Sequence, residues 1–200
     1  MNRRWTAVGV RVAGVVALVV ALAGCATTGS PGVQAPTGDP LYTTTGAVTE
    51  IAPKDRGKPI ALSGTLDTGE VIAPGEWTGK IIVVNFWYAG CAPCRAEAKD
   101  LEAVYTKFQA QGVLFVGVNV RDQEATAKTF ATEFGITYPS FLDADTGALQ
   151  LAFAGKVAPN AVPTTVVIDR RGRVASRILG QLESPSILQT LIRDALAEPQ

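Results

Sequence analysis

An apolar run that leads directly into a pair of cysteines constrains the fold of this chain more than any other feature. Residues 80–90 read KIIVVNFWYAG, and residues 91–112 read CAPCRAEAKDLEAVYTKFQAQG. The first stretch is continuously apolar and rich in β-branched residues, which predicts a buried central strand. The second predicts a helix over 92–111 that ends at Gly112. The two cysteines therefore stand where a buried strand meets the N-terminus of a helix.

This position makes a thiol reactive. The helix N-terminus presents unpaired backbone N–H groups and the positive end of the helix dipole, so a thiol at Cys91 ionises more easily. Pro93 fits the first turn, where its missing N–H costs no hydrogen bond. Cys94 can reach back to form a small disulfide ring, and we expect it to be more shielded than Cys91. An inert, stabilising disulfide is the weaker interpretation, because a bridge across two residues closes almost no loop.

Composition excludes several other kinds of site. The 200 residues include no histidine and three cysteines, with 18 Lys and Arg against 18 Asp and Glu. Without imidazole there is no Ser-His or Cys-His nucleophile, and three cysteines cannot supply a zinc site with four Cys or His ligands. The balanced charge gives no general attraction to nucleic acid. We expect no metal, no nucleic-acid partner, and no cofactor besides a redox-active Cys91–Cys94 disulfide.

The N-terminal residues indicate export and anchoring. Arg3, Arg4 and Arg11 precede an uncharged apolar stretch, residues 12–23, of the length of a signal-peptide core. LAGC, which ends at Cys25, resembles the lipobox of bacterial lipoproteins, and the resemblance implies cleavage before Cys25 and lipidation of its sulfur. An uncleaved anchor is the alternative. Either way the domain lies outside the cytoplasm, where cysteine pairs can be oxidised.

These features divide the chain into three parts. Residues 1–24 are predicted to be a lipoprotein signal peptide. Residues 25–48, rich in Thr, Gly, Pro and Ala, are predicted to be a flexible tether that begins at lipidated Cys25. Residues 49–200 are predicted to form the folded domain.

The folded part alternates strands and helices. The patterns predict, in order, a hairpin over 60–72 with its turn at Asp67–Gly69, the strand and helix around the cysteines, a strand over 113–120, a helix capped by Asp122 and ended by Gly135, a short segment over 138–142, a weak helix over 146–153, two strands joined by a turn at Arg171–Gly172, and a last helix from Ser184 and Pro185 to Ala197. This order predicts a three-layer α/β/α sandwich with a central mixed sheet and an N-terminal β-hairpin extension.

The motifs resemble a known family. A strand, C-x-P-C and a helix in this order resemble the thioredoxin superfamily. VVNFW, CAPCRAE, FLDADTG and VPTTVVID together resemble the membrane-tethered TlpA/ResA-type thiol–disulfide oxidoreductases, from about residue 50 to the C-terminus. The resemblance implies that Pro163 is a cis-proline beside the cysteines that helps to bind substrate, with Val162 and Trp87 as further substrate-binding candidates. Two positions depart from the pattern: Gly90 replaces a bulkier residue, and Asn85 replaces the buried acid of thioredoxin itself.

The resemblance implies an activity with two open alternatives. Cys91 would attack a client disulfide and Cys94 would resolve the mixed disulfide, with apocytochrome c as a client and a membrane thiol-electron donor to recharge the pair. The reverse reaction, oxidation of secreted proteins, depends on a reduction potential that the sequence does not give. A copper-handling lipoprotein of thioredoxin fold is the second alternative, and the absence of histidine argues against it.

Glu97 is the remaining catalytic candidate. A helix turns about 100° per residue, so Leu101, Val104 and Phe108 fall within about 40° of Glu97 on one face. Cys94 lies on the same side. Burial should raise the pKa of this carboxyl and allow it to exchange a proton with Cys94. A glutamate at this place also recurs in ResA-type proteins. The alternative is an ordinary helix acid that favours the positive end of the dipole.

Overall fold

A computed structural model of the chain describes residues 43–45, 48–157 and 161–199. The predicted signal peptide, Cys25 and all of the predicted tether before Thr43 lie outside these residues. Residues 40–200 form one compact unit. Among the described residues, no helix is both long enough and apolar enough to cross a membrane.

Nine strands and five helices are described. The strands are β1 (Thr43–Thr45), β2 (Val48–Glu50), β3 (Gly64–Thr65), β4 (Val71–Ile72), β5 (Ile82–Trp87), β6 (Leu114–Asn119), β7 (Ser140–Leu142), β8 (Thr164–Ile168) and β9 (Val174–Leu179). The helices are α1 (Ala92–Phe108), the 3-10 turn η1 (Gln109–Gln111), α2 (Glu124–Phe134), α3 (Ala148–Ala152) and α4 (Pro185–Ala197).

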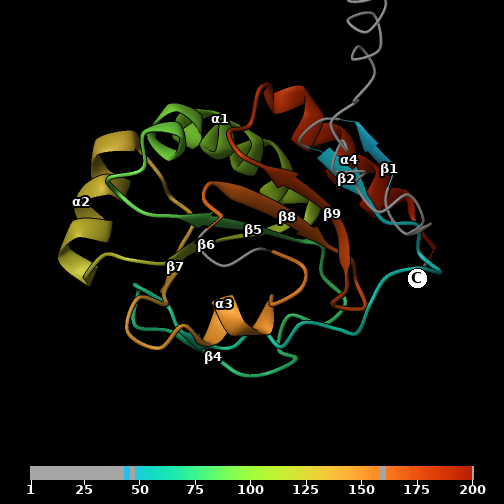
Figure 1. The fold of residues 1–200 in the computed structure, drawn as a ribbon, viewed down its shortest axis with the longest axis horizontal. Helices are drawn as coiled ribbons and strands as arrows, with labels where there is room; N and C mark the ends of the chain where they lie inside the picture. Colours follow the sequence, from blue (N-terminus) through green and yellow to red (C-terminus); the bar gives the residue numbers. More distant parts are fainter. Residues whose placement is uncertain (1–42, 46–47, 158–160, 200) are drawn as a thin grey trace, which may run out of the picture. The chain divides into compact units, whose positions relative to one another are not determined.

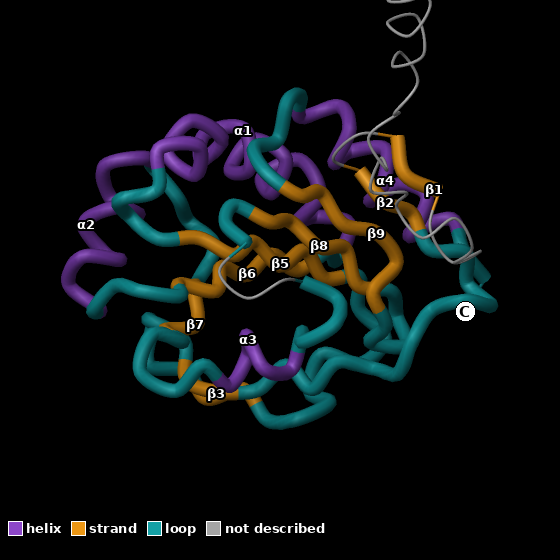
Figure 2. The backbone as a smooth tube through the Cα atoms, in the orientation of Figure 1, coloured by secondary structure: helices purple, strands orange, loops and turns teal. Residues whose placement is uncertain are grey.

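The central sheet is mixed, as predicted. Its strand order is β1-β2-β9-β8-β5-β6-β7 (Figure 1). Strands β5, β6 and β7 run parallel, whereas β8, β9, β2 and β1 pair in antiparallel fashion. Helices α1 and α4 lie on one side of the sheet, and α3 lies on the other together with the β3–β4 hairpin (Figure 2). The three-layer sandwich is confirmed.

Strand β5 organises both cores because its side chains alternate between the two faces. All six of its residues are buried. Val83 packs in the cluster that contains Leu101 of α1 and Ile192 of α4. Phe86 packs on the other face, where its ring meets the ring of Phe153 edge-on at 5.0 Å between centroids. A continuous apolar run thus becomes a strand covered on both sides, and its last residue leads to the cysteines.

The N-terminal part of the sheet differs from the prediction. The hairpin predicted over 60–72 is confirmed as β3–β4, which forms a small sheet of its own. A second hairpin, β1–β2, extends the central sheet by pairing with β9, so strand structure begins before residue 49. These strands are three residues long and contain several threonines. They have no apolar periodicity, and only backbone pairing to β9 identifies them.

The close packing of β5, β6 and β7 generates the first prediction. A Cβ atom on Gly117 of β6 would lie 2.6 Å from Nε1 of Trp87 and would collide with Oγ of Ser140. Gly117→Ala should therefore lower the free energy of unfolding by about 1–3 kcal/mol, as overpacking does in other cores. Denaturant unfolding of the oxidised protein measures this. Gly57→Ala is the matched control, since its Cβ meets only the flexible end of Lys156; equal losses for the two variants would contradict the packing argument.

Candidate functional site

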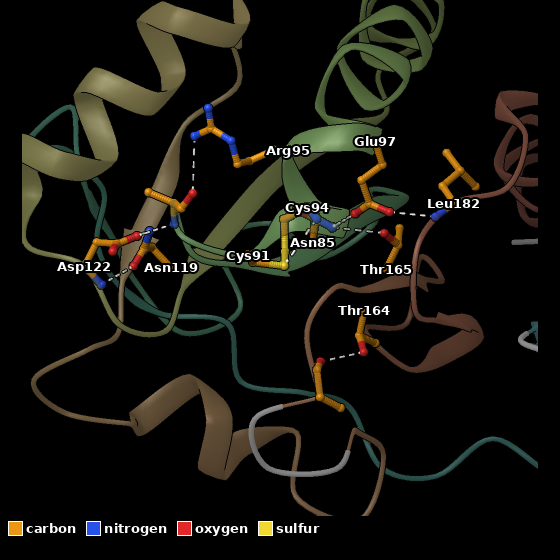
Figure 3. The surroundings of a disulfide bond; sticks show 12 residues. Asn85, Cys91, Cys94, Arg95, Glu97, Asn119, Asp122, Thr164, Thr165 and Leu182 are labelled. Atoms are coloured by element: carbon orange, nitrogen blue, oxygen red, sulfur yellow. Dashed lines mark hydrogen bonds between the residues drawn. A yellow bond between two sulfur atoms is a disulfide. The ribbon is translucent and has the colours of Figure 1, made fainter.

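The two cysteines form a disulfide at the start of α1. The Cα atoms of Cys91 and Cys94 are 5.2 Å apart. Strand β5 ends at Trp87, and Cys91 is the N-cap residue of α1. Pro93 occupies the first turn, as predicted. Figure 3 shows the disulfide between the end of the strand and the first turn of the helix.

A hydrogen bond, and not exposure, distinguishes the two sulfur atoms. We expected Cys94 to be shielded and Cys91 to be more open. Cys94 is buried as expected, but Cys91 is buried equally, with exposed fractions of 3% and 4%. The expected difference is absent because Tyr88, Ala89 and Val162 pack against the cluster that contains both cysteines. The backbone N–H of Cys94 donates to Sγ of Cys91 at 3.2 Å. A donor at this position favours negative charge on Cys91, so Cys91 remains the expected nucleophile.

Pro163 immediately precedes the first residue of β8. The Val162–Pro163 peptide bond is cis, which confirms the conformation that the family resemblance implied. Pro163 is buried and its carbonyl accepts a hydrogen bond from the N–H of Gly180 at 2.9 Å. Val162 is half-buried and packs against the cysteine cluster. Val162 is therefore close to the disulfide and still partly open to a partner.

Trp87 lies in the core. Its exposed fraction is 6%, its ring packs on Phe130 of α2 at 4.4 Å between centroids, and its Nε1 donates to Oγ of Ser140 at 3.3 Å. This burial argues against a direct contact between Trp87 and a substrate. The residue supports the strand end from which the cysteine loop begins.

Glu97 is buried on α1 one turn after Cys94, and the helix pattern predicted this burial. Its exposed fraction is 1%. Oε1 accepts a hydrogen bond from Nδ2 of Asn85 at 3.0 Å, and Oε2 accepts one from the backbone N–H of Leu182 at 2.6 Å (Figure 3). Burial raises the pKa of Glu97 to about 7, although the two hydrogen bonds act in the opposite direction. The carboxyl can therefore take up and release a proton near neutral pH.

The same contacts give Asn85 a role. The sequence showed only that Asn85 replaces the buried acid of thioredoxin. Its Nδ2 atom donates both to Glu97 and to Oγ1 of Thr165 on β8, at 3.1 Å. The buried acid next to the cysteines thus comes from α1, and the strand supplies its hydrogen-bond donor.

A contact between two loops was missed by the sequence analysis. Asp122 was predicted to cap α2, but the N-cap position is Gln123, which has no capping side-chain bond. Instead, Oδ2 of Asp122 accepts hydrogen bonds from the backbone N–H of Ala89 at 2.6 Å and from Nδ2 of Asn119 at 2.8 Å. Oδ1 of Asn119 in turn accepts the N–H groups of Arg121 and Asp122. Asp122 therefore holds the loop that precedes Cys91.

Two arginines flank the same loop. The guanidinium of Arg121 lies over the ring of Tyr88 at 4.3 Å, and that of Arg95 lies over the ring of Phe134 at 4.7 Å.

The sequence contained a signal for the contact between Asp122 and the loop before Cys91. Polar residues that follow two adjacent parallel strands meet at one edge of the sheet. Asp122 was assigned to the start of α2 instead because it also matched a helix-capping pattern.

Comparison with known proteins identifies the family. The family model named Redoxin matches residues 38–192, which is more than half of the chain. The chain belongs to the redoxin family. The resemblance to the thioredoxin superfamily and its ResA-type members is confirmed by relatives and solved structures of the same kind.

Two relatives illustrate this. Thiol-disulfide oxidoreductase ResA of Geobacillus thermodenitrificans is 33% identical over 116 residues, covering 58% of this chain and 64% of the relative. Thiol:disulfide interchange protein HelX of Rhodobacter capsulatus is 37% identical over 116 residues, covering 56% of this chain and 60% of the relative. The match therefore spans less than two thirds of each relative.

Solved structures show the same fold over more of the chain. A DsbF homologue from Corynebacterium diphtheriae is 30% identical with a TM-score of 0.65, covering 80% of this chain and 96% of the other. A secreted thiol-disulfide isomerase from Corynebacterium glutamicum is 26% identical with a TM-score of 0.69, covering 82% and 96%. This redoxin therefore has the thioredoxin fold.

The burial of Glu97 generates a prediction on pH and stability. A pKa raised from 4.5 to about 7 means that the folded redoxin binds a proton that the unfolded chain releases. This stabilising contribution is complete below pH 4.5 and is lost as the pH rises to about 7, a change of about 3 kcal/mol at 1.36 kcal/mol per unit. Glu97→Gln should lack that dependence.

The measurement is denaturant unfolding of the oxidised wild type and Glu97→Gln at several pH values between 4 and 8. The difference between their unfolding free energies should change across this range. Glu102→Gln, also on α1, controls for the loss of a helix charge. Parallel curves for wild type and Glu97→Gln would show that Glu97 titrates like an ordinary surface acid.

The contact between Asp122 and Ala89 generates another prediction. Asp122→Ala removes the acceptor from a partly buried N–H and should lower the free energy of unfolding by about 1–3 kcal/mol. It should also speed amide exchange in residues 88–91. Asp122→Asn keeps an oxygen acceptor and should have a smaller effect on both. Hydrogen-exchange mass spectrometry of the peptide from 88 to 94 measures the exchange rate of this loop. Asp145→Ala, which removes an exposed acid, is the control. Unchanged exchange in Asp122→Ala would mean that the loop does not depend on this bond.

Proposed function

We propose that this redoxin is an extracytoplasmic, lipid-anchored thiol–disulfide oxidoreductase that reduces disulfides in client proteins. The observation that carries the proposal is the Cys91–Cys94 disulfide at the N-terminus of α1, with the N–H of Cys94 directed at Sγ of Cys91. The buried carboxyl of Glu97 one turn further along the helix adds a proton acceptor with a pKa near neutrality.

The reaction begins with the reduced pair. The Cys91 thiolate, favoured by the helix N-terminus and by the Cys94 N–H, attacks one sulfur of a client disulfide. The client disulfide breaks, a mixed disulfide forms through Cys91, and the first client sulfur leaves as a thiolate that takes a proton from solvent. At this stage Cys91 is oxidised in the mixed disulfide, and Cys94 is still a thiol.

Resolution returns the protein to the oxidised state. Cys94 loses its proton and attacks Sγ of Cys91, which forms the Cys91–Cys94 disulfide and releases the second client thiolate. Glu97 is the group that accepts the Cys94 proton, and burial keeps its pKa close enough to neutrality for this exchange. A membrane thiol-electron donor then reduces the disulfide by the same exchange in reverse.

Residues 162 and 163 are the proposed place for the client backbone. Pro163 is held by Gly180, and Val162 packs against the cysteine cluster while remaining half-exposed. An extended client segment beside Val162 would bring its disulfide towards Cys91. The resemblance to ResA-type proteins supports apocytochrome c as the client, since its haem-attachment cysteines must be reduced.

Anchoring is proposed from the N-terminal sequence alone. The lipobox-like LAGC motif supports lipidation of Cys25 and release of residues 1–24. Two other functions use the same fold, namely oxidation of secreted proteins and copper handling. The oxidase uses the same sulfur chemistry in the opposite direction, and the chain has no histidine to favour copper. No observation favours oxidation of secreted proteins or copper handling over reduction of client disulfides.

Trapping of the mixed disulfide tests the assignment of the two cysteines. Cys94→Ala should accumulate a covalent complex with a disulfide-containing client through Cys91, since no resolving thiol remains. Cys91→Ala should accumulate none. Non-reducing gels of reactions with insulin or with an oxidised apocytochrome c measure the complex, and the double variant is the control. Trapping through Cys94, or by neither variant, would refute the proposed roles.

A further inference from the structure

We propose that the end of the domain opposite the disulfide binds anionic phospholipid headgroups, so that the anchored protein holds its cysteines away from the membrane. The surface is called the basic end and consists of four exposed cations around the β8–β9 turn, namely Lys54, Lys58, Lys80 and Arg171. The inference rests on the lipid anchor of the proposed function and goes beyond it, since an anchor alone sets no orientation.

Contacts from three parts of the chain converge on this turn. The N–H of Ile60 donates to the carbonyl of Gly172 at 2.7 Å, which places the segment of Lys58 beside the turn. The N–H of Gly79 donates to the carbonyl of Arg170 at 2.9 Å, which places Lys80 there. Arg173 donates to the carbonyl of Pro53 at 3.0 Å, next to Lys54. The three segments that carry the four cations therefore meet at the β8–β9 turn although these segments are distant in sequence.

Two acids of this region, Asp169 and Glu198, already form ion pairs with other cations. Asp169 accepts hydrogen bonds from Arg56 and Arg173, and Glu198 pairs with Arg56. Arg170 donates to three backbone carbonyls at the end of α4. No acidic side chain among the described residues pairs with any of the four exposed cations. Three further acids lie nearby: Asp55, which is half-buried, Glu76, which accepts the N–H of Ala73, and the exposed Glu50, which pairs with Ser176 in the sheet.

The charge is concentrated at this end of the domain. Seven of the fifteen Lys and Arg residues that follow Cys25 lie here, against five of the eighteen Asp and Glu residues. The remainder of the chain after Cys25 has eight basic against thirteen acidic residues. An anionic surface therefore attracts this end and repels the rest, which orients the domain as well as binding it.

A hollow beside the turn has the size and lining for a headgroup. It measures about 350 Å³, and it is lined by residues from the segment at 53–54, the turn and the end of α4. Lys54 and Arg171 line this hollow and have no acidic partner in the part of the chain that the structure describes, and the two carboxylates that also line it, Asp169 and Glu198, pair with Arg56. A phosphodiester fits this chemistry because its charge meets two cations that no carboxylate neutralises.

The direction of the sheet separates the basic end from the disulfide. Strand β8 begins next to Pro163 and ends next to Asp169, so its five residues lie between the two ends. Five residues of strand extend over about 17 Å. In Figure 1 the β5–α1 connection and the C-terminus lie at opposite ends of the sheet. A membrane that contacts the basic end leaves the cysteine loop facing outward.

The chain also enters the sheet at the basic end. Thr43 pairs with Glu50, and Glu50 pairs with Ser176 near the start of β9. Seventeen residues lie between Cys25 and Thr43. A chain of that length spans at most about 60 Å. A lipid at Cys25 would therefore keep Thr43, and with it the basic end, within about 60 Å of the membrane.

Because the domain is tethered to the membrane, weak contacts are enough to hold the basic end on the lipid surface. Each Lys or Arg near an anionic surface strengthens binding about fivefold, so four give a factor of several hundred. That corresponds to weak binding for a free domain. A short linker holds the domain at an effective concentration on the order of millimolar, at which weak contacts are populated.

The experiment uses the full chain reconstituted in vesicles of neutral phosphatidylcholine, or of phosphatidylcholine with phosphatidylglycerol. Hydrogen-exchange mass spectrometry compares the peptides that cover 51–60 and 168–175 with the peptide that covers 88–96. We expect slower exchange at the basic end in the anionic vesicles only, with little change around the cysteines. The protection should disappear at high salt.

Variants identify the residues responsible. Replacing Lys54, Lys58, Lys80 and Arg171 together by Gln should abolish the protection while reductase turnover in solution is retained. The matched control replaces four exposed cations elsewhere, namely Lys99, Lys107, Lys128 and Arg193, and should keep the protection. Equal protection in neutral and anionic vesicles, or persistence of protection in the first variant, would overturn the proposal.

A flotation assay tests the lipid anchor separately from the basic end. Lipidation is supported if the wild type floats with neutral vesicles and Cys25→Ala does not. The exchange data then decide whether the basic end binds anionic lipid. If Cys25→Ala changes nothing, the lipid anchor fails, and the anionic vesicles still decide the surface. Protection at 51–60 and 168–175 then supports the basic end, and its absence contradicts it.

Discussion

The buried carboxyl of Glu97 connects the elements on which the cysteine site depends. It accepts one hydrogen bond from Asn85 on β5 and another from the backbone of Leu182, which lies between β9 and α4. Its burial is tolerated because both oxygens have donors, and it is still costly enough to raise the pKa of Glu97 to about 7. Helix α1, the central strand and the loop before α4 are thus fixed relative to one another by one side chain. A proton acceptor with this pKa then stands one turn from the resolving cysteine.

Burial of the disulfide follows from the same architecture. The cysteine loop is covered by Tyr88, Ala89 and Val162, and Asp122 holds it from the adjacent strand end. Both sulfur atoms are therefore shielded, and reactivity depends on local hydrogen bonds more than on exposure. The helix N-terminus and the N–H of Cys94 favour a thiolate at Cys91. The residues near the disulfide that remain exposed or half-exposed consequently include Gly90, Ala92, Pro93 and Val162.

The sequence predicted those elements whose signals are local and strong. The β5–α1 unit was recognisable because a continuous apolar run leads to a helix start with proline, and Ser184 with Pro185 marked the start of α4 for the same reason. Helical periodicity also predicted the burial of Glu97. The β1–β2 hairpin was missed because three-residue strands rich in threonine depend on a partner strand distant in sequence. Asp122 was assigned to the wrong bond because a helix cap and a contact between loops use the same residue type. The convergence of basic residues on the β8–β9 turn likewise required tertiary contacts.

The central claim is that Cys91 and Cys94 form a reversible couple that donates electrons to client disulfides. The most direct test is to equilibrate the domain with defined ratios of reduced and oxidised glutathione or dithiothreitol at pH 7 and to measure the fraction of the disulfide. The account predicts one two-electron transition with a potential more negative than about −200 mV, in the range of known reductants. A potential near −120 mV, as in the strong oxidant DsbA, would contradict it and would assign the same site to the formation of disulfides.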